Sequence, residues 1–174
     1  DLSDALVTDL GLTNQEMMER IVTAGIVGLG GAAFPSHVKL TPPKGKSCDV
    51  LIINGVECEP YLTADHRLML EQGAELIVGI KILMQLLNSS RAVIGIENNK
   101  RDAIKQLEQL LESESGIEVT PLKVQYPQGG EKQLINATIG KEVPAGALPI
   151  EVGAVVHNVG TIVAIYHAVM KGRP

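Results

Sequence analysis

The chain alternates between short apolar runs and longer segments whose apolar residues recur with helical spacing. The short runs, and one alternating stretch that contains Pro121, predict strands at 50–53, 92–96, 117–124 and 154–156. Helical spacing predicts helices at 63–87, with a break near Gly73, and at 101–111, 131–139 and 161–170. The segment 143–150, rich in Pro, Gly and Ala, is expected to be a loop. Because strands and helices alternate, we predict an α/β fold with a Rossmann-like parallel sheet of about four strands flanked by helices.

A helix and a glycine-rich loop are predicted before the first strand. Thr13 and Glu16 form a capping box, and apolar residues continue with helical spacing to about residue 25. The loop Gly28-Leu29-Gly30-Gly31-Ala32-Ala33-Phe34-Pro35 comes next. A dinucleotide fingerprint needs a strand before its glycines and a helix after them. Because a helix precedes this loop and Pro35 interrupts the segment after it, we interpret it as a ligand loop of another kind with exposed backbone N–H groups.

Polar and glycine residues gather where the predicted strands end. Parallel sheets bind ligands outside the carboxyl ends of their strands, so we expect these residues to share one edge with the glycine-rich loop. They are Asn54, Glu57 and Glu59; Asn98 and Asn99; Gly129, Gly130 and Glu131; and His157, Asn158 and Thr161.

The residues alone leave the roles of three groups open. Glu57 and Glu59 are suited to acid–base work or to hydrogen-bonding a ribose, and equally to being solvated loop acids. The segment 129–131 fits an anion cradle at the start of a helix, or a simple turn. Phe34, the single Phe of the chain, is either a ligand platform or a core residue.

Composition narrows the function classes. The net charge of −5, without a basic stripe, argues against nucleic-acid binding. Two cysteines without a Cys-x-x-Cys encode neither a zinc nor an iron–sulfur site, and we interpret the four histidines as structural or surface groups. The longest apolar run, 76–87, is too short to span a bilayer. We expect an N-terminal helical segment, 1–27, and an α/β domain, 28–174, from a longer polypeptide.

Four motifs, in order, resemble the RnfC subunit of the Rnf ion-translocating electron-transport complex. They are Gly-Leu-Gly-Gly-Ala-Ala-Phe-Pro-Ser-His-Val-Lys-Leu from residue 28, Asn-Gly-Val-Glu-Cys-Glu-Pro-Tyr from residue 54, Tyr-Pro-Gln-Gly-Gly-Glu-Lys-Gln from residue 126 and His-Asn-Val-Gly-Thr from residue 157. The resemblance covers about residues 20–174. More distantly, the chain resembles the NADH-oxidising flavoprotein subunit of respiratory complex I, and the microcompartment cobalamin reductase is a further relative.

The resemblance implies an FMN- and NAD(H)-binding domain that passes electrons to iron–sulfur clusters located elsewhere in the longer chain. It implies a peripheral place on the cytoplasmic face of the bacterial inner membrane, with other subunits of a membrane electron-transport complex as partners. Lys39 and the loop glycines would hold FMN, Phe34 and Glu59 would contact NADH, and the others would line the flavin site. The implied cofactor-binding residues are Gly28, Gly30, Gly31, Phe34, Lys39, Asn54, Glu57, Glu59, Gly130, Glu131, Asn158 and Thr161.

Three residues depart from the pattern of these relatives. Ala33 replaces a Gly, Val56 replaces an Asp that would hydrogen-bond flavin, and Lys132 replaces a second Glu beside the nucleotide. If position 33 requires a positive φ, alanine strains it by roughly 1 kcal/mol. Two alternatives therefore stand beside the main hypothesis: a cobalamin-reductase-like flavoprotein, and a docking module of the same fold that binds no cofactor.

Overall fold

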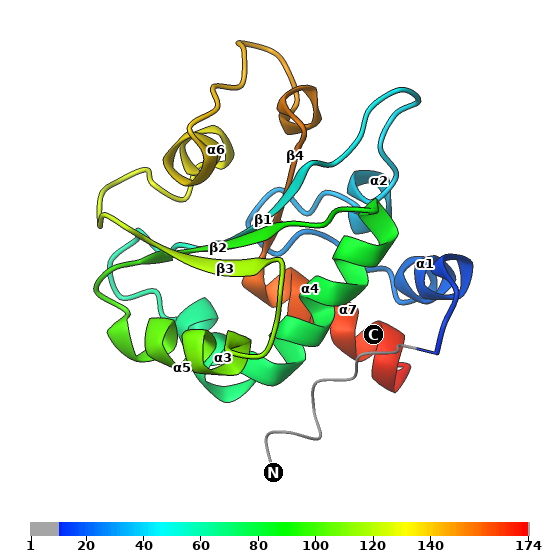
Figure 1. Cartoon of the computed structure of the whole chain (residues 1–174), viewed down its shortest axis with the longest axis horizontal. Helices are drawn as coiled ribbons and strands as arrows, with labels where there is room; N and C mark the ends of the chain where they lie inside the picture. The colour runs from blue at the N-terminus through cyan, green and yellow to red at the C-terminus, as the bar shows by residue number, and fades with distance from the viewer. Residues whose placement is uncertain (1–10, 174) are drawn as a thin grey trace.

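The structure, a computed structural model, describes residues 11–173. A single sheet of four parallel strands lies at its centre, in the order β3-β2-β1-β4 (Figure 1). The strands are β1 (Val50–Gly55), β2 (Ala92–Glu97), β3 (Ile117–Leu122) and β4 (Ala154–Asn158). The predicted α/β fold with a parallel sheet of about four strands is confirmed. Residues 1–10 of the expected N-terminal segment lie outside the described residues.

Helices connect the strands at the positions that the periodicity predicts. The break expected near Gly73 separates α3 from α4. A short 3-10 helix begins within the segment predicted as a loop, because Pro149 at its start presets a helical φ. The helices are α1 (Asn14–Thr23), α2 (Ser36–Lys39), α3 (Ala64–Glu71), α4 (Gly73–Leu87), α5 (Arg101–Leu111), α6 (Glu131–Ile139), η2 (Pro149–Val152) and α7 (Val159–Lys171).

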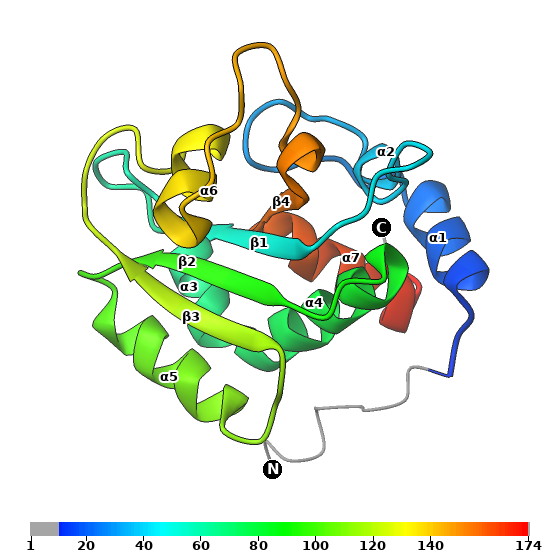
Figure 2. The same cartoon turned by 45° about the horizontal axis from the view of Figure 1, so that its top comes forward.

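The helices cover the two faces of the sheet unequally. Alternate strand residues such as Leu51 and Ile53 belong to a large core with α1, α3, α4, α5 and α7. Their neighbours Val50 and Ile52 face a smaller cluster formed mainly with α6, which lies on the opposite side (Figure 2). Both faces are buried, which explains why the strands occur in the sequence as continuous apolar runs.

The strand order reverses between β1 and β4. The chain proceeds from β1 to β2 to β3 in one direction and then returns to place β4 on the other side of β1. The connections from these two neighbouring strands therefore diverge, and their carboxyl ends leave a crevice, which is where open α/β sheets bind ligands. Asn54 and Asn158 face each other in register at this point.

Close packing of α4 against α7 depends on Gly79. A methyl group at this residue would lie 2.7 Å from Cγ2 of Ile162 and 2.8 Å from its carbonyl oxygen. We predict that Gly79→Ala lowers the free energy of unfolding by about 1–3 kcal/mol, as overpacking does, when measured by urea denaturation. Gly73→Ala, whose methyl group would come closest to the movable end of the Leu110 side chain, serves as the control and should cost less. Equal costs for the two variants would contradict this account of the packing.

Candidate functional site

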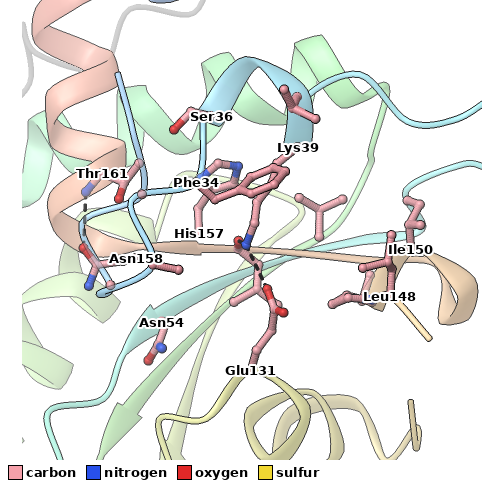
Figure 3. Close-up of a pocket in the computed structure, with 18 of the residues that line it drawn as sticks. Phe34, Ser36, Lys39, Asn54, Glu131, Leu148, Ile150, His157, Asn158 and Thr161 are labelled. Carbon is pink, nitrogen blue, oxygen red and sulfur yellow. Dashed lines mark hydrogen bonds and ion pairs between the residues drawn. The ribbon is translucent and has the colours of Figure 1, made fainter. Parts of the chain in front are cut away.

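A cavity of about 580 Å³ lies at the point where the strand order reverses. This volume is within the range of small-molecule and cofactor sites. The glycine-rich loop with α2, strand β4, and the segments that begin α6 and η2 form its walls (Figure 3). Its lining residues are Gly28, Gly30, Ala32, Phe34, Ser36, Val38, Lys39, Thr41, Pro42, Pro43, Asn54, Gly129, Gly130, Glu131, Leu148, Pro149, Ile150, Ala154, Val155, Val156, His157, Asn158 and Thr161.

The glycine-rich loop is closed on itself and fixed to the start of α7. Val27 and Pro35 form an antiparallel bridge, and the Gly28 N–H donates to the carbonyl of Phe34 at 2.8 Å. At the tip, the Leu29 N–H donates to Oγ1 of Thr161 at 2.8 Å. Thr161 is fully buried. The loop is therefore held in place by a residue that is distant in the sequence.

Two asparagines fix the carboxyl ends of β1 and β4. Asn158 caps α7 by accepting from the Thr161 N–H at 3.3 Å, and its amide donates to Oδ2 of Asp65 at 2.6 Å. Burial raises the pKa of Asp65, against the lowering effect of this hydrogen bond. Asn54 donates to the carbonyl of Gly129 at 3.0 Å and accepts from the Val56 N–H at 3.1 Å. Both asparagines line the cavity in orientations set by the protein.

An ion pair joins two walls of the cavity. The ammonium of Lys39, from α2, lies 2.8 Å from Oε1 of Glu131, the first residue of α6, and also donates to the carbonyl of Val156 at 3.1 Å (Figure 3). Among the described residues that line the cavity, these two are the only Lys, Arg, Asp or Glu side chains. Their side chains are 33% and 40% exposed, so water screens their attraction. A lysine ammonium has three N–H groups, and one remains for a ligand.

Two uncharged polar groups lie buried in the cavity wall. Oγ of Ser36 and Nε2 of His157 have no hydrogen-bond partner in the described part of the protein. Burial, and to a smaller extent the nearby charge of Lys39, lowers the pKa of His157 from 6.5 to about 3. The imidazole is therefore neutral at physiological pH.

The structure brings nine of the twelve residues expected to bind a cofactor to the cavity: Gly28, Gly30, Phe34, Lys39, Asn54, Gly130, Glu131, Asn158 and Thr161. Gly31, Glu57 and Glu59 are outside its lining. Gly31 shapes the loop through its φ of 117°. Glu57 is buried and accepts from the N–H groups of Asp65 at 2.8 Å and His66 at 3.0 Å, where α3 begins. Glu59 is exposed on the same connection.

Some lining residues were not among the expected cofactor-binding residues. His157 was expected at this edge of the sheet and was interpreted as a structural or surface group; it lines the cavity and is buried, so it is not a surface group. Its position directly before the helix-capping Asn158, two residues after the core residue Val155, was a usable signal. Ser36 and the apolar residues Leu148 and Ile150 gave no such signal, because they reach the cavity only through folding. Asn98 and Asn99, which come after β2 and were expected at the same edge, are not part of the lining.

Comparison with known proteins agrees with this geometry. A sequence model of the Nuo51 FMN-binding domain matches residues 21–167, which include every wall of the cavity. The chain belongs to this family of FMN-binding domains. It is 53% identical over 163 residues to an RnfC subunit from Clostridium ljungdahlii, which is part of a proton-translocating ferredoxin:NAD(+) oxidoreductase complex. It is 50% identical over 154 residues to the counterpart from the Na(+)-translocating complex of Acetobacterium woodii.

These relatives confirm the resemblance to RnfC subunits. The corresponding subunit of an ion-translocating oxidoreductase complex from Pseudomonas aeruginosa is 44% identical over 158 residues. The three matches cover 94%, 88% and 91% of this chain, in the order given. The chain spans 35% of the length of the first two relatives and 20% of the third.

Solved structures share the fold of this FMN-binding domain family. A chain of an NAD+-reducing [NiFe]-hydrogenase in the H2-reduced state superimposes with a TM-score of 0.80 at 23% sequence identity. The match covers 91% of this chain and 31% of the hydrogenase chain. An NAD+-reducing [NiFe]-hydrogenase in the air-oxidised state gives a TM-score of 0.78. Within residues 11–173, no helix combines the length and the hydropathy needed to cross a membrane.

Ala33 has a positive φ, 49°, so the alanine that replaces glycine at this position is strained. An L-residue in this left-handed region costs roughly 1 kcal/mol, which glycine would relieve, although glycine also makes the unfolded chain more flexible. We predict that Ala33→Gly changes the free energy of unfolding by less than about 0.5 kcal/mol, whereas Ala32→Gly, at a residue without a positive φ, lowers it by about 0.5–1 kcal/mol. Urea denaturation of both variants checks this. Equal losses would show that Ala33 is not strained.

The neutral state of His157 should make stability depend on pH. Between about pH 3 and pH 6.5 the unfolded chain binds a proton at this residue and the folded protein does not, so stability falls as the pH is lowered through this range. We predict that lowering the pH from about 7 to about 5 costs wild type about 2 kcal/mol more of unfolding free energy than it costs His157→Gln. Urea denaturation at both pH values measures the difference. Identical pH dependence in the two proteins would contradict a buried neutral imidazole.

Proposed function

We propose that the domain binds FMN in this cavity and passes electrons between NAD(H) and iron–sulfur clusters in other parts of an RnfC-like subunit. The observation that carries the proposal is that a single cavity, at the ligand-binding edge of the sheet, is built from all four motifs of the family. Two relatives are named as subunits of ferredoxin:NAD(+) oxidoreductase complexes, which supports the electron-transfer role.

The residues of the cavity fit FMN at its phosphate end. Lys39 supplies a cation with one N–H to spare. Beside it, α6 begins after Gly130 without a side-chain cap, so the N–H groups of its first turn are available to an anion. Glu131 holds the Lys39 ammonium at the wall, where an incoming phosphate would share the same cation. These groups make this side of the cavity the proposed phosphate subsite.

The remaining residues of the cavity wall fit the flavin ring and the nicotinamide that would react with it. Phe34 is 45% exposed and offers an aromatic face on which a planar ring can stack. Apolar residues, among them Val38, Leu148 and Ile150, line other parts of the wall and would pack against a bound ring. Bound FMN would supply the chemistry, accepting a hydride from the nicotinamide and releasing its electrons singly. The residues of this chain bind, orient and shield it.

Of the three departures from the family pattern, Lys132 is the one that concerns the nucleotide side of the site. Lys132, which stands where a second Glu is expected, donates to the carbonyl of Pro144 at 2.9 Å and lies outside the cavity lining. Glu59 is exposed beside Cys58, so its carboxylate is accessible to a nucleotide that approaches from solvent. We propose that NAD(H) reaches the flavin from the open side of the cavity near Phe34.

The domain would act as a peripheral part of a membrane complex, on the cytoplasmic face of the bacterial inner membrane, with the other subunits as partners. The relatives are named as subunits of ion-translocating complexes, which supports this placement. A docking module of the same fold that binds no cofactor would be expected to have a crowded and dry site. A cavity of about 580 Å³ with polar groups in its wall speaks against it.

The test is to titrate the purified protein with FMN while flavin fluorescence is measured, and then to add NADH under anaerobic conditions. We predict that wild type binds FMN and that NADH bleaches the bound flavin. Lys39→Met should weaken FMN binding by about 10- to 100-fold, the range for a lost hydrogen bond to a charged group, and should leave riboflavin binding unchanged because riboflavin lacks the phosphate. Lys46→Met removes a similarly exposed, paired lysine outside the cavity and is the matched control.

The outcomes separate the parts of the proposal. If a folded sample binds no FMN, the cofactor assignment is wrong. If Lys39→Met weakens FMN and riboflavin equally, Lys39 is not at the phosphate. If bound FMN is not bleached, the link to NADH fails for this chain while flavin binding stands. Glu59→Gln, which should slow bleaching without changing FMN affinity, tests the nucleotide contact separately.

A further inference from the structure

A buried group of ionisable side chains lies outside the cavity, at the carboxyl ends of β1 and β2. Glu57 follows β1, Glu97 is the last residue of β2, and Lys100 comes directly before α5. Their exposed fractions are only 6%, 1% and 9%, and none of the three lines the cavity. A buried ion pair is seldom more stabilising than apolar side chains of the same size. A role in holding neighbouring segments in place therefore explains this group better than a contribution to stability does.

Lys100 supplies the positive charge of the group. Its ammonium lies 3.7 Å from Oε2 of Glu57. Burial raises the pKa of Glu97, and the charge of Lys100 and the backbone N–H of Glu57 oppose this rise. The carboxylates of Glu57 and Glu59 add to it. Lys100 thus balances two buried carboxyl groups, and its loss would leave Glu57 as a buried carboxylate without this cation.

Glu57 uses both of its carboxylate oxygens to hold the start of α3. Oε1 accepts from the Asp65 N–H at 2.8 Å, and Oε2, the oxygen that faces Lys100, accepts from the His66 N–H at 3.0 Å. Thr63, at the N-cap position of this helix, makes no side-chain cap of its own. The first N–H groups of a helix need an acceptor, and negative charge suits this end of a helix. Glu57 therefore takes the place of the cap, and Lys100 balances the charge that this brings into the interior.

The start of α3 in turn orients a residue of the cavity wall. Asp65 is the second residue of α3, and its Oδ2 accepts from the side-chain amide of Asn158 at 2.6 Å. Asn158 lines the cavity and caps α7. A continuous set of contacts therefore leads from Lys100 to Asn158 through two acidic residues, and it joins segments that are far apart in the sequence.

We propose that Lys100 is a positioning residue, which acts through the buried carboxylate of Glu57 and the start of α3 to set the orientation of Asn158 in the cavity wall. Lys100 itself lies outside the cavity lining. Glu97 faces the same cation and so adds to the need for a positive charge at residue 100. The effect on FMN rests on the proposed function, whereas the contacts within the protein do not depend on it.

Amide hydrogen exchange without flavin, followed by NMR, tests the contacts within the protein. Lys100→Met keeps most of the length of the side chain and removes its charge. Relative to the N–H groups of the strands, we expect the Asp65 and His66 N–H groups to exchange about tenfold faster in this variant, because their hydrogen bonds to a charged group are weakened. The side-chain amide resonance of Asn158 should shift. Lys100→Arg, which keeps the charge, should restore the wild-type values.

Lys81→Met is the matched control. Lys81 is also a mostly buried, paired lysine: its ammonium lies 2.7 Å from Glu114, and its side chain is 20% exposed against 11% for Lys100. The pair joins α4 to the turn that leads into β3, at the amino ends of the strands. This variant should leave the exchange at the start of α3 and the affinity for FMN unchanged, even where it lowers stability.

A second variant covers the case in which Lys100→Met does not fold. Lys100→Met combined with Glu97→Gln also removes one of the two buried carboxylates, and it still leaves Glu57 without its cation. Compared with Glu97→Gln alone, this double variant should show the same faster exchange at Asp65 and His66.

FMN titration tests the connection to the cavity wall. We expect Lys100→Met and Asp65→Ala each to weaken FMN binding by about threefold to tenfold, the effect of one neutral hydrogen bond. Because both changes act on the same contact to Asn158, the double variant should bind FMN no more weakly than the weaker of the single variants. Independent effects would multiply instead.

Several results would overturn the inference. Unchanged exchange at Asp65 and His66 in Lys100→Met does so whether or not the protein binds flavin, and an equal effect of Lys81→Met reduces the result to a general loss of stability. If the effects of Lys100→Met and Asp65→Ala on FMN affinity multiply, Lys100 acts by another route. If wild type binds FMN and Lys100→Met binds it equally well, the inference fails and the proposed function survives. Faster exchange in Lys100→Met, in a protein whose wild type binds no FMN, supports the positioning of Asn158 and disproves the proposed function.

Discussion

The hydrogen bonds at the start of α7 are the constraint on which the rest of the site depends. Asn158 caps the helix, Thr161 accepts from the tip of the glycine-rich loop, and Asp65 holds the Asn158 amide. These contacts join the end of β4, the start of α3 and the loop before the sheet. Without them the loop would lack a fixed position over β4, and the cavity would lose one wall. Because the atoms are partly or fully buried, each broken bond would leave a costly unpaired group.

The cavity combines two kinds of polar chemistry in an apolar frame. The ion pair of Lys39 and Glu131 is partly exposed, so it contributes little to stability and stays available for exchange with a charged ligand. Ser36 and His157 are buried and uncharged, so they add polar groups without charge to the wall. Besides burial, the nearby charge of Lys39 lowers the pKa of His157 and helps to keep its imidazole neutral.

Local signals in the sequence predicted the sheet and its helices, and the resemblance to RnfC subunits supplied the expected cofactor-binding residues, nine of which reach the cavity. Periodicity located β1, β2 and β4 closely, because buried parallel strands are apolar at nearly every position. The four motifs shared with RnfC subunits implied Lys39, Asn54 and Asn158 as site residues, and all three line the cavity. The position of Glu57 was not predictable in this way. Its carboxylate serves the backbone of α3, a contact that depends on the direction in which the chain leaves β1.

By itself, the sequence determined the alternation of elements, the parallel α/β fold and the family, because each is encoded in short-range pattern or in contiguous motifs. Only the tertiary structure decided which polar groups meet. Lys39 and Glu131 are 92 positions apart, and Leu29 and Thr161 are 132 apart, yet both pairs are in hydrogen-bond contact. Contacts at this separation leave no trace in local periodicity. For the same reason, the unpaired state of Ser36 and His157 follows only from the folded arrangement, which removes both from water and supplies neither with a partner among the described residues.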